Sequence, residues 1–212
     1  MKFRFYAFWL AAIMIVIFGI QFVFPSFTEY FLLKSFSDSL SEPWRFLTAV
    51  FLHGGLAHLI LNLFALLVFG SVLERFVGGG RFLAVFLVTG ILANLFSSLF
   101  YDSSLGASGA IFGIIGTLIY IRPSMTVWAF GLPMPLFVAG ILWAVGDLLG
   151  AYGFFAGNPI SNTGNLAHLS GMFFGLVFGM FYRRLVQRRA RKVNVSLDER
   201  DVRNWERHYL GR

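Results

Sequence analysis

Among the polar residues inside long apolar stretches of the chain, four could do chemistry together: His58, Asn62, Ser108 and His168. A serine hydroxyl beside an imidazole becomes a nucleophile, because the histidine removes its proton as a general base. His58 and Asn62 both carry N–H donors, which a developing oxyanion needs in the transition state. These are the residue types that acyl transfer through an activated serine would require.

Ser108 lies in the segment "GASGAIFG", residues 106–113, at the expected start of an apolar helix. The first N–H groups of a helix have no acceptor within the helix, and together with the helix dipole they favour an oxyanion. The alternative is a simple capping role, since serine is a preferred N-cap residue. On its own, this segment does not separate the two interpretations.

His168 lies in "NLAHLSGMFFG", residues 165–175, at a depth that matches Ser108 in its own apolar segment. Gly171 and Gly175 follow three and seven residues later and therefore share its helical face. That face can pack closely against the glycine-rich helix that carries Ser108. A core histidine bonded to a carbonyl group is the alternative interpretation.

His58 and Asn62 are four residues apart, so they share one face of a helix and can act as oxyanion donors. Hydrogen bonding between helices is the alternative. Metal binding is disfavoured because His53 and His58 lack the i, i+4 spacing of two ligands on one helix. We therefore predict no metal and no cofactor.

Asp147 is the one further group of possible catalytic interest, in the segment "WAVGDLLGAY", residues 143–152. A carboxylate can orient a catalytic histidine as a third member of the site. A carboxylate in this position is more often a packing or interfacial group, and the sequence assigns Asp147 no role.

The elements that must position these residues are membrane-spanning helices. The composition is 58% hydrophobic and 13% charged, without cysteine, which excludes disulfides, zinc–thiolate sites and thiol nucleophiles. A span needs about 20 apolar residues. Six stretches approach this length, at residues 6–24, 57–75, 82–100, 106–122, 133–153 and 164–184. They predict an all-α polytopic membrane protein.

The remaining segments suggest how the chain is organised and oriented. Residues 25–56 are too polar to span and are expected at the membrane interface as short amphipathic pieces. Positive charge is concentrated in the tail, which favours contact with anionic lipid over nucleic acid. The positive-inside rule then predicts cytoplasmic termini and a site that opens toward the outer face. We expect a membrane domain over residues 1–185 and a basic cytoplasmic tail over residues 186–212.

Three segments together resemble the rhomboid family of intramembrane serine proteases. They are "HGGLAHLILN" (residues 53–62), "GASGAIFG" (106–113) and "AHLSGMFFG" (167–175), in the order of the family's motifs. Trp44-Arg45 and Glu74-Arg75 also match family dipeptides. The resemblance covers roughly residues 6–185 and implies a six-transmembrane-helix rhomboid bundle.

The resemblance also implies roles. Ser108 would be the nucleophile, His168 its base, and His58 and Asn62 the oxyanion donors, in a Ser–His dyad that forms an acyl-enzyme. Phe112 stands where the family often has tyrosine, so ring stacking is kept while a hydroxyl contact is lost. Implied substrates are single-span or polytopic membrane proteins, cut in or next to a transmembrane helix in the cell membrane.

Two other classes of protein compete with a protease. A catalytically silent rhomboid-like protein would bind membrane helices without cutting them, but it would be expected to lack the serine or the histidine. A small transporter or channel would need paired charges or interrupted helices near the midplane. Asp147 is the candidate for such a group and has no opposite charge within the spans. The protease interpretation is therefore preferred.

Overall fold

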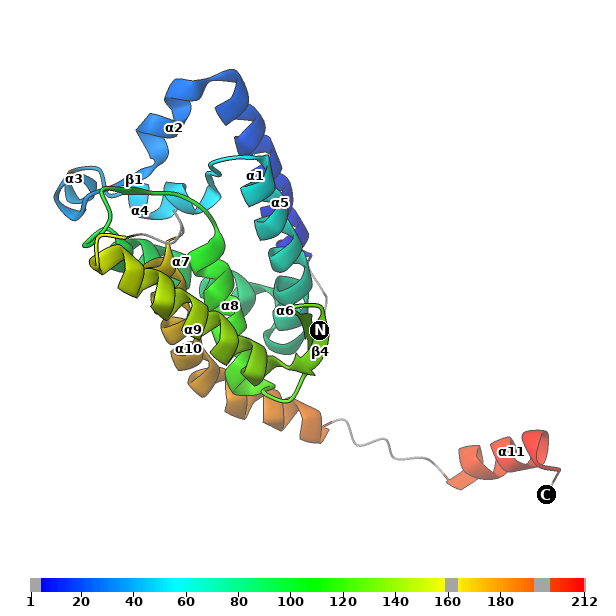
Figure 1. The fold of residues 1–212 in the computed structure, drawn as a ribbon. Coiled ribbons are helices and arrows are strands. Elements are labelled where there is room, and N and C mark those ends of the chain that lie inside the picture. Colours follow the sequence, from blue (N-terminus) through cyan, green and yellow to red (C-terminus); the bar gives the residue numbers. More distant parts are fainter. Residues whose placement is uncertain (1–4, 159–163, 193–198, 212) are drawn as a thin grey trace.

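The computed structural model describes residues 5–158, 164–192 and 199–211. It is a helical bundle in which the terminal helix α11 lies apart from the other helices (Figure 1). The beginning of the predicted membrane domain, residues 159–163 and part of the basic tail 186–212 lie outside the described residues.

Five helices or helical runs in the described ranges are long and apolar enough to cross a membrane. They are α1 (Tyr6–Val23), the run formed by α5 (Leu56–Ala65), the π-turn η2 (Leu66–Gly70) and α6 (Ser71–Val77), then α7 (Gly79–Ser97), α9 (Leu136–Phe155) and α10 (Asn165–Lys192). The expectation of an all-α polytopic membrane protein is confirmed.

The predicted span 106–122 is shorter than expected. Helix α8 (Ser108–Ile121) has 14 residues, or about 21 Å of helix, whereas the hydrocarbon core of a bilayer is about 30 Å thick. Most of its side chains are buried, so α8 has little contact with lipid and need not match the bilayer thickness. A short central helix can therefore begin at depth, below one surface of the bundle.

The predicted span 133–153 also begins too early. Residues Thr126–Ala129 (β3) and Leu132–Pro135 (β4) form an antiparallel hairpin, and α9 begins only at Leu136. Pro133 and Pro135 explain the difference, because proline lacks the N–H group that a helix interior requires.

Helices α8 and α10 pack at backbone distance. A Cβ atom on Gly171 would overlap the carbonyl oxygen of Gly109, and one on Gly175 would overlap that of Gly113. The Thr117 hydroxyl lies 2.9 Å from the carbonyl oxygens of both Gly113 and Gly175. Small residues thus allow the two helices that carry Ser108 and His168 to lie side by side.

Short elements fill the connection between α1 and α5. They are α2 (Pro25–Phe31), β1 (Leu33–Lys34), α3 (Phe36–Ser41), α4 (Arg45–Thr48) and the 3₁₀ turn η1 (Ala49–Phe51). The buried Arg45 guanidinium donates to the carbonyl oxygens of Glu29 (2.8 Å) and Leu32 (2.7 Å) and pairs with Glu42. Strand β1 pairs with β2 (Ser103–Ser104), which connects this segment to the loop leading into α8. The final helix, α11, covers Glu199–Tyr209.

Candidate active site

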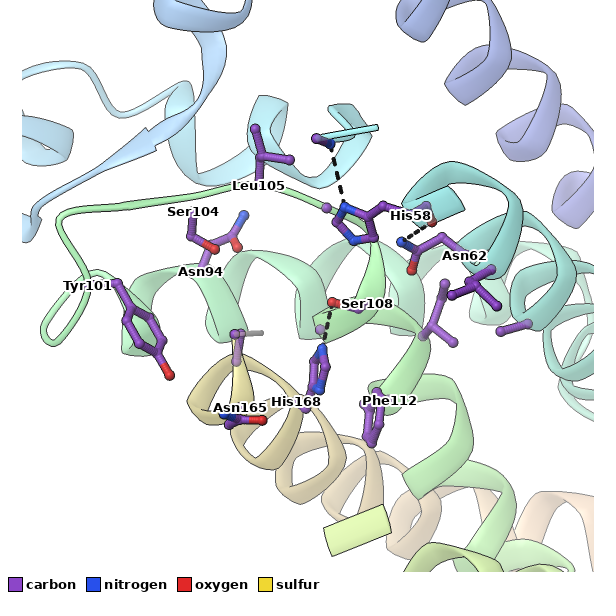
Figure 2. A pocket seen from close by; sticks show the side chains of 18 of the residues that line it. His58, Asn62, Asn94, Tyr101, Ser104, Leu105, Ser108, Phe112, Asn165 and His168 are labelled. Atoms are coloured by element: carbon purple, nitrogen blue, oxygen red, sulfur yellow. Dashed lines mark hydrogen bonds between the residues drawn. The ribbon is translucent and has the colours of Figure 1, made fainter. Parts of the chain in front are cut away.

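A cavity of about 1160 Å³ lies among α5, α7, α8, α9, α10 and the loop that precedes α8. Ser108, His168, His58 and Asn62 all line it (Figure 2). Ser108 and His168 come from α8 and α10, whose close approach was described above, and the other two residues come from α5. Four residues from three segments of the sequence therefore meet at one cavity.

Ser108 is the first residue of α8 and does not act as its cap. Ala107 occupies the N-cap position, and no side chain caps this helix. The Ser108 hydroxyl instead lies 2.8 Å from Nε2 of His168 (Figure 2). The backbone N–H groups of the first turn of α8 are therefore left for another acceptor in the cavity.

His168 lies in the first turn of α10, and neighbours on both sides hold its ring. Phe112, one turn into α8, stacks on the imidazole with ring centroids 4.3 Å apart and an interplanar angle of 4°. The second ring nitrogen, Nδ1, lies 3.0 Å from Oδ1 of Asp147 on α9. The stacking fixes the plane of the imidazole, and the contact with Asp147 fixes its rotation within that plane, so Nε2 is directed at Ser108.

Asp147 is the site residue to which the sequence assigned no role. It lies behind His168 and is not among the residues that line the cavity. The sequence did carry one signal: Gly150 and Ala151 follow three and four residues later and mark the buried face of α9. Helical periodicity alone would have placed Asp147 on that face.

His58 packs against the loop that leads to Ser108. Gly106 has a φ of +128°, and a Cβ there would lie 2.7 Å from Cε1 and 2.9 Å from Nε2 of His58. Nδ1 of His58 accepts a long hydrogen bond of 3.5 Å from the Gly54 N–H. With Nδ1 as acceptor, the ring proton lies on Nε2, on the side of the Ser108 loop.

Asn62 is buried one turn along α5 and donates from Nδ2 to the His58 carbonyl oxygen at 3.0 Å. An amide nitrogen has two hydrogens, so one donor is left for a ligand in the cavity. The Asn62 and His58 side chains lie together in the close-up view, beside Ser108 (Figure 2).

Comparison with known proteins places this arrangement in a family. The family model of the Rhomboid domain matches residues 40–185. The chain belongs to the rhomboid family. The matched range contains α8, most of α10 and all four residues that the sequence predicted for the site.

Several curated rhomboid proteins are similar to this rhomboid. The rhomboid protease GluP of Bacillus subtilis is 41% identical over 138 residues, which are 63% of this chain and 25% of that protein. RHOMBOID-like protein 6, mitochondrial, of Arabidopsis thaliana is 31% identical over 147 residues, 66% of this chain and 43% of that protein. The rhomboid protease GlpG of Haemophilus influenzae is 28% identical over 157 residues, 71% of this chain and 76% of that protein. The chain thus spans a quarter to less than half of the length of the first two relatives.

Two further titratable groups of this rhomboid border the site. Burial, followed by the nearby charge of His58, lowers the pKa of His53 to about 4, so its imidazole is neutral at neutral pH. Burial raises the pKa of Tyr101, whose hydroxyl accepts a hydrogen bond of 3.3 Å from the Leu166 N–H. Tyr101 therefore remains protonated and ties the loop before α8 to the start of α10.

Across residues 5–158, 164–192 and 199–211, no group of three or more His, Asp or Glu residues could hold a metal ion. The Ser108 hydroxyl, the His58 and His168 imidazoles and the Asn62 amide line the cavity, and the Asp147 carboxylate lies behind His168.

Proposed function

We propose that this rhomboid is an intramembrane serine endopeptidase in which Ser108 is the nucleophile and His168 its general base. The observation that carries the proposal is the 2.8 Å hydrogen bond between Ser108 Oγ and His168 Nε2 at a cavity inside a bundle of membrane-spanning helices. Relatives that are named rhomboid proteases support the same activity.

The proposed reaction proceeds through an acyl-enzyme. Ser108 Oγ attacks the peptide carbonyl carbon while its proton moves to His168 Nε2. The C–N bond then breaks, and His168 returns this proton to the leaving amine. Water attacks the resulting ester with His168 again as base, which releases the carboxylic acid and restores the Ser108 hydroxyl.

The oxyanion of the tetrahedral intermediate would be held by three donors. These are Nε2–H of His58, the free amide hydrogen of Asn62 and the backbone N–H of Ser108 at the start of α8. The short length of α8 supports this assignment, because it sets these N–H groups at membrane depth beside a cavity that can hold water.

The proposed substrates are membrane proteins with one or several spans, cut where a transmembrane helix ends or unwinds. Peptide carbonyls inside a helix are occupied in hydrogen bonds, so cleavage is expected near small or helix-breaking residues. We further propose that the protein lies in the cell membrane with both termini in the cytoplasm and its cavity open to the outer face. The proposed division is a membrane domain over residues 1–185 and a basic tail over residues 186–212.

A fluorophosphonate serine probe tests the assignment on the full chain in detergent. We expect labelling of the wild type and complete loss of labelling in Ser108→Ala and His168→Ala. Ser104→Ala is the matched control, because Ser104 lines the same cavity and is not one of the proposed catalytic residues, and it should label normally. A Ser108→Ala protein that labels like the wild type would contradict the nucleophile assignment.

The competing function is helix binding without cleavage. Folded wild-type protein that neither reacts with the probe nor cuts a transmembrane peptide would favour it. Cleavage of such a peptide by the wild type, and not by Ser108→Ala, would exclude it.

A further inference from the structure

Both nitrogens of the His168 imidazole are within hydrogen-bond distance of a side chain: one of the Ser108 hydroxyl, the other of a carboxylate. Nε2 lies 2.8 Å from Ser108 Oγ, and Nδ1 lies 3.0 Å from Asp147 Oδ1. The Asp147 and His168 side chains are 9% and 13% exposed, so this pair is largely shielded from solvent. Three side chains from α8, α10 and α9 thus form one line of hydrogen bonds.

The local fold of α9 turns Asp147 inward. Its neighbours Val145, Leu148 and Leu149 are exposed on the outside of the bundle, whereas Asp147 is buried. Gly150 brings α9 close to the first turn of α10, because a Cβ there would overlap the amide of Asn165. The carboxylate is therefore held beside His168 by the packing of two helices.

A carboxylate buried within a membrane span is costly, and it normally marks a functional group with an identifiable partner. Here the partner is an imidazole that already faces the proposed nucleophile. A packing role alone would be met at lower cost by an apolar residue, since α9 is otherwise rich in leucine, alanine and glycine.

We propose that Asp147 is a positioning residue that converts the Ser108–His168 pair into a Ser–His–Asp triad. The inference rests on the proposed function. An ionised carboxylate can only accept hydrogen bonds, so Nδ1 of His168 must carry the proton and donate it to Oδ1. Nε2 is then left as the acceptor that the Ser108 hydroxyl requires.

The same carboxylate acts when the proton moves. As Ser108 Oγ bonds to the carbonyl carbon, its proton passes to Nε2 and the imidazole becomes a cation. Asp147 stabilises this cation across the Nδ1–H···Oδ1 hydrogen bond and remains unprotonated throughout. The resemblance to the rhomboid family implies a dyad, so a triad in this chain goes beyond it.

Two other titratable side chains interact electrostatically with the His168–Asp147 pair. His58 on α5 is close enough for its charge to interact with that of His168, and Tyr101 lies in the loop that precedes α8 and senses the charge of Asp147. Phe112 covers one face of the ring and carries no charge. A change in pH dependence after substitution of Asp147 must therefore be compared in a background where His58 and Tyr101 are intact.

The test is the rate of fluorophosphonate labelling between pH 5 and 9 for full-length protein in detergent. Asp147→Asn should lower this rate by about 10² to 10⁴-fold, because an amide can present an N–H to Nδ1 and select the wrong tautomer. The acidic limb of its pH–rate profile should move to lower pH, since the imidazolium has lost its anionic neighbour. With a transmembrane peptide substrate, kcat should fall while KM changes by less than about threefold.

Two further variants separate positioning from a structural effect. Asp147→Glu keeps the charge and should retain at least about tenfold more activity than Asp147→Asn, with the acidic limb near its wild-type position. Gly140→Ala lies two turns before Asp147 on α9, where an added Cβ would meet the side chain of Ile119, and it leaves Asp147 and Gly150 unchanged, so its pH–rate profile should keep the wild-type shape. Should Asp147→Asn fail to fold, the comparison of Asp147→Glu with Gly140→Ala carries the test.

The outcomes distinguish this inference from the function on which it rests. If folded wild-type protein does not label, the proposed catalytic roles of Ser108 and His168 are wrong, and the triad is wrong as well. A labelling wild type together with an Asp147→Asn protein of unchanged rate and pH profile overturns the triad and leaves the dyad. If Asp147→Asn and Gly140→Ala lose equal activity with unshifted profiles, Asp147 is a packing residue and the inference is wrong.

Discussion

The ring of Phe112 lies parallel to the imidazole of His168, with centroids 4.3 Å apart and planes 4° from parallel. A stacked pair of this kind contributes about 0.5–1.5 kcal/mol beyond the area that it buries. We expect Phe112→Ala to lower the labelling rate of Ser108 about tenfold or less, because the imidazole gains rotational freedom. Phe112→Tyr keeps the stack and should remain within about twofold of the wild type.

Phe112→Leu is the matched control for this prediction, since leucine fills much of the space without a planar ring. It should resemble Phe112→Ala in rate while keeping a higher midpoint of thermal unfolding. If Phe112→Leu and Phe112→Tyr were equally active, the space that Phe112 fills, and not its ring plane, would matter.

The oxyanion donors can be tested by removing one amide. Asn62→Ala should reduce kcat toward a transmembrane peptide by about 10²- to 10³-fold, the usual cost of losing one oxyanion donor. Asn94→Ala is a suitable control, because Asn94 also lines the cavity but donates its amide to the Phe46 carbonyl at 2.9 Å. The control should lower stability by about 1 kcal/mol and leave kcat nearly unchanged. Equal losses of kcat in both variants would argue against Asn62 as an oxyanion donor.

The approach of α8 and α10 can be tested at Gly171. Its missing side chain leaves room for the Gly109 carbonyl oxygen, so Gly171→Ala must separate the helices that carry Ser108 and His168. Overpacking of this kind typically costs about 1–3 kcal/mol. We expect a lower unfolding temperature together with slower probe labelling. Gly19→Ala on α1, where nothing lies within 4 Å of an added Cβ, should change neither quantity.

The meeting of Ser108 and His168 could be anticipated from sequence because both the residue types and the glycine spacing are local patterns. Two motifs at matching depth, each with small residues at intervals of four, predict helices that touch. The ends of the helices could not be predicted as well from the sequence. Helix α8 is short because surrounding helices shield it from lipid, which is a tertiary property that hydropathy along the chain does not record.

The contact between Asp147 and His168 could not be predicted from sequence patterns. Its carboxylate reaches His168 only because Gly150 allows α9 to pack against the first turn of α10, 21 residues after Asp147. No motif joins these positions in the sequence. The neutral state of His53 is likewise a consequence of burial in a loop, which residue type alone does not reveal.

Helix α1 is attached to the bundle by a buried carboxylate. Glu74 on α6 accepts hydrogen bonds of 3.2 Å from the backbone N–H groups of Tyr6 and Ala7, at the start of α1. A carboxylate at a helix N-terminus satisfies free donors and complements the helix dipole. Glu74→Ala should therefore lower stability by about 1–3 kcal/mol, measured as a drop in the unfolding midpoint in detergent. Glu29→Ala, at an exposed position, should have little effect, and a comparable drop there would contradict the prediction.

His53 provides a test that depends on pH. Its buried ring packs edge-on to His58 with centroids 5.2 Å apart, and neither ring nitrogen has a hydrogen-bond partner among the described residues. The nearby Phe51 backbone raises the His53 pKa and so offsets part of its decrease, although it does not form a hydrogen bond with the ring. Above pH 6.5 the imidazole is neutral in both the folded and the unfolded chain, so its titration contributes nothing to the pH dependence of stability there.

Between pH 6.5 and about pH 4 the unfolded chain binds a proton at His53 that the folded chain does not. Stability must therefore fall as the pH falls through this window, by up to about 3 kcal/mol at its lower end. His53→Leu removes the titrating group, and its unfolding midpoint should exceed that of the wild type by a margin that widens from pH 7.5 to pH 4.5. His208→Leu, at an exposed position in α11, is the control and should follow the wild-type curve. Parallel curves for His53→Leu and the wild type would show that His53 does not titrate below its ordinary range.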